Sequence, residues 1–463
     1  MSDLIFSKLA ISDVMSKNLQ SLGYEKMTPI QSQSLPHILN GRDVMAQAKT
    51  GSGKTAAFGI GALSKIDLKI HKIQVVVLCP TRELADQVAK ELRRIGRQQH
   101  NLKVLTLCGG TPMGPQIASL EHGAHCVVGT PGRICDHLSR RTLNLRFAQT
   151  LILDEADRML DMGFTEDLDK VIKQTPKNRQ TLLFSATYPE NIQAMSERVQ
   201  RNSVHIVVEG GENNLDIEQK FYEVKRTQKS DWLVALLAHH QPESSVVFCN
   251  TKKDCSDVAN ALRQAGFVAE AIHGDLEQKD RDDVLALFSN KSISILVATD
   301  VAARGLDIKD LSLVCNYEPS RNPETHVHRV GRTGRAGNKG LAITLYSPQE
   351  ERRVLEIEKM TSAKYKKEKA FTSIQLGVGK PFYPKMQSLC IHGGKKHKLR
   401  PTDILGALTA KKDLLGSDVG KIMISDFHSF VALKKEKFAK GMSLLSDYKI
   451  KGREFKVRKV HLS

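Results

Sequence analysis

The sequence predicts an α/β protein made of two parallel-sheet lobes followed by a small α+β domain. Short apolar runs rich in β-branched residues alternate with segments of helical spacing, which is typical of parallel strands joined by crossover helices. This alternation is interrupted once, and residues 386–463 then follow the different order β-α-β-β-α-β. At 463 residues, the chain is long enough for about three domains with cores of their own.

The first lobe is expected over residues 1–208. Its strand-like runs are RDVMAQA, IQVVVLCP, KVLTLCGG, HCVVGTPGR, TLILDEAD and TLLFSAT. The stretch EGGENNLDI at 209–217 combines Gly, Asn and acidic residues and indicates a linker between the lobes.

The alternation restarts after this linker and predicts a second lobe over 218–355. Its strand-like runs are SSVVFCNT, VAEAIHG, ISILVATD, LSLVCNYEP and GLAITLYS. A charged, Gly- and Pro-bearing connecting segment at 356–385 leads to the last domain, 386–463. There we expect strand QSLCIHGG, helix PTDILGALTAKKDLL, two strands in KIMISDFHSFVAL, helix KEKFAKGMSLLSDY and strand REFKVRKV, the ferredoxin-like order.

The stretch AKTGSGKT at 48–55 has the composition of a phosphate-binding loop. Gly51 and Gly53 let the backbone N–H groups close around phosphate oxygens, Lys54 reaches their charge, and Thr55 offers a hydroxyl to Mg²⁺. Ala48 stands where the general pattern has Gly, so a flexible Gly/Ser turn is an alternative. Because a strand-like run precedes the loop and an apolar helical pattern follows it, the context favours an ATP or GTP site.

An acidic pair follows the apolar run TLIL. Asp154 and Glu155 would lie at the carboxyl end of a parallel strand, where nucleotides bind. The expected roles are Mg²⁺ binding through water for Asp154 and handling of the attacking water for Glu155. The alternative is an acidic first turn of a helix.

Charge and cysteine content limit the class of partner and compartment. The formal net charge is +18, and residues 386–463 hold 17 Lys and Arg against 7 Asp and Glu. This excess points to a polyanion, either nucleic acid or an acidic membrane surface. The eight cysteines form no C-x-x-C pair, and the sequence has neither a signal-peptide pattern nor an apolar window of membrane-spanning length, so we expect a cytoplasmic protein with free thiols.

Taken together, the motifs resemble those of the DEAD-box RNA helicases. They occur in order over residues 1–350 as AKTGSGKT, PTRELA, GG, TPGR, DEAD, SAT, ATDVAARGLD and HRVGRTGR. The resemblance implies two RecA-like lobes, RNA-stimulated ATP hydrolysis and the cofactors ATP and Mg²⁺. In this family Ala is an ordinary first residue of the phosphate loop.

The resemblance also implies an adenine-reading segment within residues 4–32. Gln31 suits the N6/N7 edge of adenine, which favours ATP over GTP, and Tyr24 would stack on the base. Met27 stands where the family usually has Pro, but Thr28 matches. The implied nucleotide-binding set is Phe6, Tyr24, Thr28, Gln31, Ala48, Lys49, Thr50, Gly51, Ser52, Gly53, Lys54, Thr55 and Asp307, the last contacting the ribose hydroxyls.

Further catalytic and RNA-contacting residues are assigned by the same resemblance. Arg332 and Arg335 would approach the γ-phosphate from the second lobe, and His328 would link their motif to the DEAD acids. Ser185 and Thr187 of SAT would couple hydrolysis to strand separation. The implied contacts with the RNA backbone, which would make the core RNA-specific and sequence-blind, come from Thr81, Arg82, Gly110, Thr130, Arg133, Thr251, Gly274, Arg281 and Thr299.

The last domain resembles the C-terminal RNA-recognition-like domain of the DbpA subfamily, bacterial DEAD-box helicases directed to 23S rRNA near hairpin 92. It departs from ordinary RNA-recognition domains because His428 and Phe430 occupy the stacking positions of one strand and Cys390 replaces the aromatic of its partner. We therefore expect recognition away from the usual sheet face. The candidate basic residues are Lys395, Lys396, Lys398, Arg400, Lys449, Lys451 and Arg453.

Several functional hypotheses remain open from the sequence. The leading one is an ATP-dependent helicase that remodels 23S rRNA in precursors of the large ribosomal subunit. The alternatives are a general RNA chaperone whose basic tail is only a tether, and an ATP-switched RNA clamp that does not unwind. A DNA translocase is the weakest of the hypotheses, and the sequence names no protein partner.

Overall fold

The computed structural model describes residues 5–48, 51–208, 217–303, 311–334, 339–369, 380–410, 413–425 and 427–460. The chain divides near residue 213 into two compact units. The first unit holds one seven-stranded sheet, and the second holds another seven-stranded sheet and a four-stranded one. This confirms the predicted fold class of two parallel-sheet lobes and a small α+β domain.

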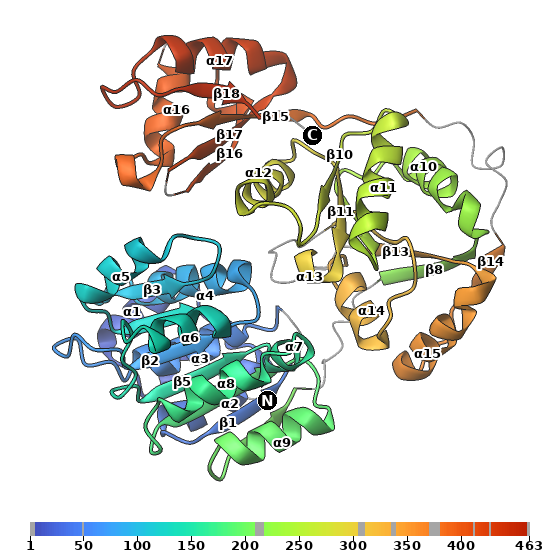
Figure 1. The fold of residues 1–463 in the computed structure, drawn as a ribbon. Helices are drawn as coiled ribbons and strands as arrows, with labels where there is room; N and C mark the ends of the chain where they lie inside the picture. The colour runs from blue at the N-terminus through green and yellow to red at the C-terminus, as the bar shows by residue number, and fades with distance from the viewer. Residues whose placement is uncertain are drawn as a thin grey trace. The chain divides into compact units, whose positions relative to one another are not determined.

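The first unit is a parallel sheet of order β3-β4-β2-β5-β6-β1-β7 with helices on both faces (Figure 1). The strands are β1 (Val44–Gln47), β2 (Val75–Leu78), β3 (Val104–Leu107), β4 (Cys126–Gly129), β5 (Thr150–Asp154), β6 (Gln180–Ser185) and β7 (Val204–Val207). The helices are η1 (Phe6–Lys8), α1 (Asp13–Ser21), α2 (Pro29–Leu39), α3 (Lys54–Leu63), α4 (Arg82–Ile95), α5 (Met113–Glu121), α6 (Pro131–Ser139), α7 (Ala156–Asp161), α8 (Thr165–Lys173) and α9 (Glu190–Val199).

Side chains of alternate residues on the strands pack into two separate hydrophobic cores, one on each face of the sheet. Val77 and Phe184 point into the core shared with α1 to α4, whereas Val76 and Leu183 point into the core shared with α6 to α9. Strands buried on both faces explain why these runs are continuously apolar in the sequence. The helix after the phosphate loop, α3, packs against β6 through Phe58, whose ring centroid lies 5.3 Å from that of Phe184.

The larger sheet of the second unit has the order β10-β11-β9-β12-β13-β8-β14, again with parallel neighbours. Its strands are β8 (Ile217–Glu223), β9 (Ser245–Cys249), β10 (Ala269–Ile272), β11 (Ile295–Thr299), β12 (Leu313–Asn316), β13 (Gly340–Tyr346) and β14 (Lys367–Lys369). The helices are η2 (Arg226–Gln228), α10 (Lys229–His240), α11 (Lys252–Gln264), α12 (Gln278–Ser289), α13 (Asp300–Ala303), α14 (Pro323–Val330), η3 (Pro348–Glu350) and α15 (Glu351–Thr361).

This second lobe extends beyond the end drawn from the sequence. The predicted boundary at residue 355 falls inside α15, and β14 adds a further strand beside β8. A three-residue strand of Lys and Glu carries no apolar alternation, so the pattern gave no sign of it. The predicted linker, 209–217, lies outside the described residues except for Ile217, which begins β8.

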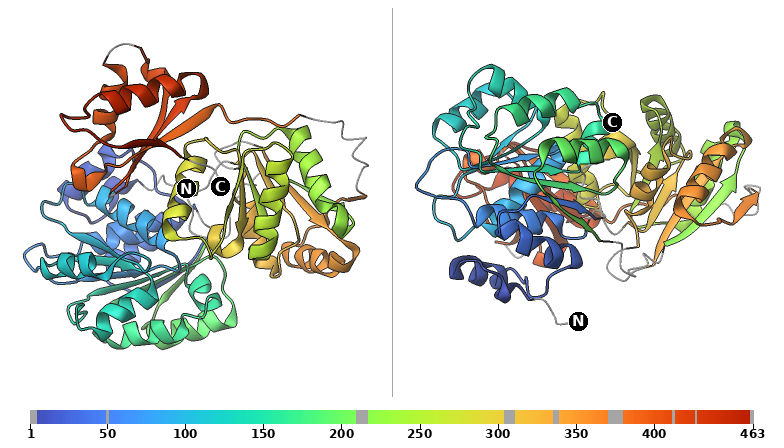
Figure 2. Two further views of the ribbon diagram at one scale, coloured as in Figure 1. Left: turned by 45° about the horizontal axis from the view of Figure 1, so that its top comes forward. Right: turned by 90° about the horizontal axis from the view of Figure 1, so that it is seen from below.

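The last domain is an antiparallel sheet of order β16-β17-β15-β18 with two helices on one face (Figure 2). Leu389 and Ile391 of the central strand β15 pack with Leu408 of α16 and Leu444 of α17. The elements are β15 (Met386–Ile391), η4 (Lys395–His397), α16 (Pro401–Thr409), η5 (Gly416–Asp418), β16 (Val419–Ile424), β17 (Ser429–Lys434), η6 (Lys435–Lys437), α17 (Phe438–Asp447) and β18 (Val457–Lys459). The predicted β-α-β-β-α-β order is confirmed.

Replacing Phe58 with Ala should lower the free energy of unfolding by about 3–5 kcal/mol, because the cavity would lie between α3 and β6 in the first core. Phe147→Ala is the matched control, since Phe147 is 49% exposed and its loss should cost less than about 0.5 kcal/mol. Urea unfolding of both variants gives the two values. Equal losses would contradict the packing role of Phe58.

Candidate nucleotide and nucleic-acid sites

The phosphate loop connects the end of β1 to the start of α3. Gly51 and Gly53 have φ angles of 88° and 94°, in the left-handed region that glycine adopts without strain. Lys54 begins α3 with its side chain buried, and its Nζ donates to the Ala48 carbonyl at 2.9 Å. Backbone N–H groups at the start of a helix together with a lysine form a setting that stabilises phosphate. The predicted Lys49 and Thr50 lie outside the described residues, while Ser52 and Thr55 are half-buried within the loop and first turn.

Gln31 connects the upstream segment to this loop. Its Nε2 donates to the carbonyl of Gly53 at 3.1 Å, and its Oε1 accepts from the backbone N–H of Thr28 at 2.9 Å. A Cβ added to Gly53 would lie 2.5 Å from Nε2 of Gln31. The glutamine predicted to read adenine therefore lies directly beside the phosphate loop.

The two aromatic residues of the same segment contact each other. Phe6 is buried, and its ring meets that of Tyr24 edge-on at 5.5 Å. The Tyr24 hydroxyl donates to Glu91 of α4 at 2.5 Å, and burial together with this carboxylate raises the pKa of Tyr24 well above its usual value. The tyrosine is thus held against α4, and its stacking on adenine stays a prediction.

Asp154 ends β5 as a buried carboxyl group. It is 3% exposed, and among the described residues its Oδ1 has no hydrogen-bond partner. Burial raises its pKa to about 7, opposed by the positive charge of Lys54 and reinforced by Glu155. Glu155 follows with a φ of 52°, which starts α7 with a sharp turn. A carboxylate oxygen that has no hydrogen-bond partner among the described residues is a suitable ligand for a divalent cation.

Asp157, which sequence reasoning did not single out, joins the DEAD motif to SAT. Its Oδ2 accepts from the backbone N–H groups of Ala186 and Thr187 at 3.2 and 3.1 Å, and from Oγ1 of Thr187 at 2.9 Å. Ser185 Oγ donates to the carbonyl of Thr187 at 2.7 Å. The motif's second Asp therefore fixes the loop after β6. In the sequence, the position of Asp157 three residues after Asp154 in the same motif was the signal that could have marked it as a site residue.

The predicted RNA contacts of the first unit gather around Gly109 and Gly110. A Cβ added to Gly109 would lie 3.4 Å from Nη2 of Arg82 and 3.9 Å from Nη2 of Arg133. Gly110 has a φ of 70°, and a Cβ there would overlap the Arg82 guanidinium. Nη1 of Arg133 also donates to the carbonyl of Thr111 at 3.0 Å. Two further members of the set, Thr81 and Thr130, are the N-cap residues of α4 and α6.

The predicted RNA contacts of the second lobe follow the carboxyl ends of adjacent strands, and this side of the sheet is called its carboxyl edge below. Thr251 caps α11 after β9, accepting from the N–H of Asp254, and Thr299 ends β11. Gly274 follows β10, and a Cβ there would lie 3.7 Å from Cε of Lys252. Because β10, β11 and β9 are neighbouring parallel strands, these three residues lie side by side at the carboxyl ends of the strands. Arg281 lies in the first turn of α12.

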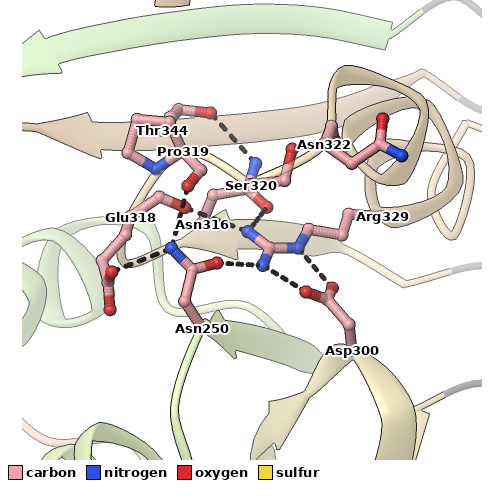
Figure 3. A network of polar contacts seen from close by, with 9 residues as sticks. All are labelled: Asn250, Asp300, Asn316, Glu318, Pro319, Ser320, Asn322, Arg329 and Thr344. Carbon is pink, nitrogen blue, oxygen red and sulfur yellow. Dashed lines mark hydrogen bonds and ion pairs between the residues drawn. The ribbon is translucent and has the colours of Figure 1, made fainter. Parts of the chain in front are cut away.

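Arg329 of α14, another residue missed from the sequence, organises this edge (Figure 3). Its buried guanidinium donates to both carboxylate oxygens of Asp300 at 2.6 and 2.7 Å and to Oδ1 of Asn250 at 2.8 Å. It also reaches the carbonyl of Glu318 at 3.0 Å. The planar guanidinium thus joins the loops after β11, β9 and β12, which are adjacent in the sheet.

The motif HRVGRTGR at 328–335, from here on called the arginine-rich motif, lies only partly within the residues that the structure describes. His328 lies in the last turn of α14 and Arg332 follows it, so Arg329 anchors the helix from which both emerge. The predicted Arg335 and Asp307 lie outside the described residues.

Basic residues of the last domain surround a pocket of about 110 Å³. Lys398 and Lys451 both have positive φ angles, 60° and 53°, and Nζ of Lys451 donates to the carbonyl of Lys398 at 3.3 Å. The remaining lining residues are His397, Leu399, Ile450, Arg453 and Phe455. Three predicted residues therefore meet at one pocket. Of the others, Lys395 and Lys396 lie in η4, Arg400 caps α16, and Lys449 pairs with Glu454 at 3.8 Å.

The described part of the chain shows neither a cluster of metal ligands nor a membrane-spanning helix. Among those residues, His, Cys, Asp and Glu nowhere gather in a group of three able to hold a metal ion. Likewise, none of the described helices combines the length and apolar character needed to cross a bilayer. All eight cysteines are free thiols, as expected.

Three family models match the chain in succession. They are the DEAD/DEAH box helicase over residues 28–195, the helicase conserved C-terminal domain over 228–337 and the DbpA RNA binding domain over 388–459. The ATP-dependent RNA helicase DbpA of Escherichia coli is 52% identical over 441 residues, covering 95% of this chain and 96% of that protein. The chain belongs to the DEAD-box ATP-dependent RNA helicases.

Other relatives match the two lobes. The DEAD-box ATP-dependent RNA helicase CshA of Bacillus cereus is 45% identical over 360 residues, covering 78% of this chain and 68% of that protein. Among solved structures, S. cerevisiae Dbp5 bound to RNA and ADP BeF3 matches with a TM-score of 0.73 and 29% identity, over 80% of this chain and 97% of that chain. Mss116p bound to ssRNA and AMP-PNP matches with a TM-score of 0.72 and 26% identity, over 81% of each chain. The chain is thus an RNA-stimulated ATPase and RNA helicase with a DbpA RNA-binding domain.

The raised pKa of Asp154 predicts a pH-dependent stability. Because the folded state keeps the proton up to about pH 7 while the unfolded chain releases it near 3.8, the stabilisation is complete below 3.8 and is lost as the pH rises to about 7. Asp154→Asn cannot ionise and should lack this loss. In urea unfolding without Mg²⁺ or nucleotide, the unfolding free energy of the variant should therefore rise relative to that of wild type by about 2–3 kcal/mol between about pH 5 and 7. A constant difference across this range would contradict the buried, proton-binding state.

Proposed function

We propose that this helicase remodels short duplexes of 23S rRNA, around hairpin 92, in precursors of the large ribosomal subunit. The observation that carries the proposal is the DbpA RNA binding domain over 388–459, because the two lobes alone are shared with helicases such as CshA that match only 78% of the chain. The proposal also places the protein in the cytoplasm, a reducing compartment that suits eight free thiols.

The ATP chemistry is assigned to the phosphate loop and the DEAD acids. Lys54 would exchange its bond to the Ala48 carbonyl for the β and γ phosphates, and Gln31, held beside Gly53, would read adenine. Glu155 would orient the attacking water. Asp154, together with the hydroxyl of Thr55, fits a Mg²⁺ ion, because its buried Oδ1 has no partner among the described residues. The ion would neutralise charge on the β and γ phosphates.

We assign the arginine-rich motif to transition-state stabilisation. Arg332 and Arg335 would neutralise charge on the γ-phosphate, with His328 linking the motif to the DEAD acids and Asp307 binding the ribose. The ion pair of Arg329 with Asp300 supports this role for the motif, since it holds α14 rigidly on its sheet. The domain boundaries at 208, 217 and 385 remain part of the proposal, whereas the boundary at 355 is replaced by one after β14.

RNA binding divides between two kinds of site. The threonines, glycines and arginines at the sheet edges of the two lobes present backbone N–H groups, hydroxyls and guanidinium groups, which suit phosphate and sugar oxygens and carry no sequence information. The pocket at Lys398, Lys451 and Arg453 combines cations with the ring of Phe455, a combination that suits a base as well as a phosphate. We therefore assign target selection to the last domain.

A general RNA chaperone with a tethering tail is the second candidate. The observation that favours it is charge alone, 17 Lys and Arg against 7 Asp and Glu in residues 386–463. Such a tether would bind any RNA, with an affinity that falls steeply with salt and scales with the number of cations.

A charge-matched comparison separates these two functions. The first variant is Lys395→Ala, Lys398→Ala and Arg453→Ala, at and beside the pocket. The second is Lys435→Ala, Lys440→Ala and Lys459→Ala, which removes the same charge from exposed positions that do not line it. The measurement is competition at physiological salt between a hairpin 92 fragment and an unrelated hairpin of equal length.

Wild type and the second variant should both prefer the hairpin 92 fragment. The pocket variant should lose about tenfold or more of that preference, the value of one charge-assisted hydrogen bond. Equal losses in both variants, or displacement of the fragment by the unrelated hairpin at equal concentration, would favour the tether.

A further inference from the structure

The first lobe concentrates its positive charge at one edge of its sheet. Because its strands are parallel, the seven loops that lead from a helix into a strand all lie on the side where the strands begin, called the amino edge below. These loops, at 40–43, 64–74, 96–103, 122–125, 140–149, 174–179 and 200–203, hold 12 Lys and Arg and only 2 Asp. The other residues of 1–208 hold 14 Lys and Arg against 17 Asp and Glu. The net positive charge of the lobe therefore comes entirely from its amino edge.

Most of this charge is exposed and has no acidic partner. Ten of the twelve cations are exposed, among them Lys72, Arg146 and Lys177, and none of the ten forms an ion pair with a described residue. Of the two acids, Asp43 is buried and accepts from the backbone N–H of Arg201 at 2.7 Å. Like charges gathered in this way repel one another, and a bound polyanion would relieve the repulsion.

The second lobe shows that a parallel sheet of this kind does not require a basic amino edge. Its loops before β9, β10 and β11, at 241–244, 265–268 and 290–294, contain one cation and one acid, Lys291 and Glu243. These two side chains form an ion pair at 2.8 Å. Charge in these loops is therefore neutralised within the protein, whereas the charge at the amino edge of the first lobe is not.

Hydrogen bonds fix neighbouring loops of the amino edge to one another. Nζ of Lys103 donates to the carbonyl of His122 at 2.9 Å, and the backbone N–H of Lys103 donates to Nδ1 of His125 at 3.1 Å. Nε2 of His125 in turn donates to the carbonyl of Leu68 at 3.2 Å. The loops before β3, β4 and β2 are thereby joined.

Further bonds join the loops toward the other end of the sheet. Nε2 of Gln180 donates to the carbonyl of Arg42 at 2.6 Å, and Nη2 of Arg201 donates to the carbonyl of Arg179 at 3.0 Å. The loops before β6, β1 and β7 are connected in this way. The cations therefore lie on a preformed surface, and an anion that binds there does not have to order these loops first.

The amino edge is long and lies away from the helicase motifs. Seven strands at a spacing of about 4.8 Å place its outermost loops roughly 29 Å apart. The phosphate loop, the DEAD acids and SAT follow the opposite ends of β1, β5 and β6. Strands of four to six residues separate the two edges by roughly 13–20 Å. An extended polyanion can therefore bind the amino edge without contacting these motifs.

The residue types favour RNA over an acidic membrane surface. Seven of the twelve cations are arginines, whose planar guanidinium groups bind phosphate oxygens in pairs. In the seven loops the exposed large apolar side chains are Ile70 and Phe147, too few for the apolar face that a bilayer-binding surface buries. The chain belongs to a family that acts on RNA. The phosphate backbone of RNA is thus the polyanion that fits best.

We propose that the amino edge of the first lobe is a second RNA-binding surface, which holds the backbone of an RNA duplex on the side of the sheet opposite the phosphate loop. Its contacts carry no sequence information and need no nucleotide, because they are made by loops outside the ATP site. The surface adds to the RNA contacts at the carboxyl ends of the strands, and it does not depend on which RNA the last domain selects.

Lysine footprinting tests the surface in the full-length protein. Acetylation of single lysines is followed by mass spectrometry without nucleotide, with and without a saturating blunt RNA duplex of about 16 base pairs, a length that an RNA-binding domain can span. Lys72 and Lys177 should react at least severalfold more slowly with the duplex, whereas Lys90, exposed within α4, should not change. Unchanged rates at Lys72 and Lys177, or equal protection of Lys90, would overturn the proposal.

Two double variants matched in charge measure the strength of the contact. Lys72→Glu with Arg146→Glu reverses two exposed cations in the loops before β2 and β5, which are neighbouring strands. Lys90→Glu with Lys170→Glu is the control, because it reverses two exposed cations within α4 and α8.

The amino-edge variant should bind the duplex about tenfold or more weakly at about 0.1 M salt, where exposed charges more than about 10 Å apart are largely screened. The slope of log affinity against log salt should become shallower by about 2, because two phosphate contacts are lost. The control should lose less than about twofold. Equal losses in the two variants would reflect net charge alone and would contradict the proposal.

The ATPase rate separates this surface from the RNA contacts at the carboxyl ends of the strands. Because Lys72 and Arg146 lie at the beginnings of the strands, the amino-edge variant should keep its basal rate and its rate with a short single-stranded RNA within about twofold of wild type. A tenfold or greater loss, about 1.4 kcal/mol, would place these cations in the ATPase core and would overturn the proposal.

Vesicles that contain phosphatidylserine test the other polyanion. If the amino-edge variant lost vesicle binding but kept duplex binding, the edge would be a membrane surface and the proposal would fall. A missing preference for the hairpin 92 fragment would defeat the proposed function, whereas protection of Lys72 and Lys177 by the duplex would still support this second surface.

Discussion

Parallel pairing of β5, β6 and β1 is the constraint on which the catalytic arrangement depends. In this register Asp154 is opposite Phe184, and Gln47 is opposite Ser185, so the carboxyl ends of the three strands lie within one residue of one another. The DEAD acids, SAT and the phosphate loop leave the sheet from these three neighbouring ends. A one-residue slip in either pairing would turn the core side chains to the wrong face and separate the motifs.

Each lobe then uses one charged side chain to join adjacent loops. In the first lobe the carboxylate of Asp157 accepts three hydrogen bonds from Ala186 and Thr187. In the second lobe the guanidinium of Arg329 bonds to Asp300 and Asn250 and to the carbonyl of Glu318. Such groups are costly to bury unless every bond is made, so they fix the loop positions while the surrounding apolar core supplies stability.

The sequence predicted the two lobes and the small domain because their strands are apolar on both faces or alternate clearly. It also predicted that the Gly-rich loop lies between a strand and a helix and that Asp154 ends a strand, as the structure has them, while the phosphate and metal roles of these residues stay predictions. It missed Asp157 and Arg329, since their roles depend on loops brought together by sheet order. It also missed β14, whose charged residues follow no apolar pattern.

The central claim is that the last domain selects the RNA to which a sequence-blind ATPase responds. The most direct measurement is the ATPase rate of the full chain and of a chain ending at residue 385, each with two RNAs that share a duplex and differ only in hairpin 92. The account predicts that the full chain hydrolyses ATP faster with the hairpin-bearing RNA and that truncation removes this difference while leaving a common, lower rate. A truncated chain that still prefers the hairpin-bearing RNA would contradict it.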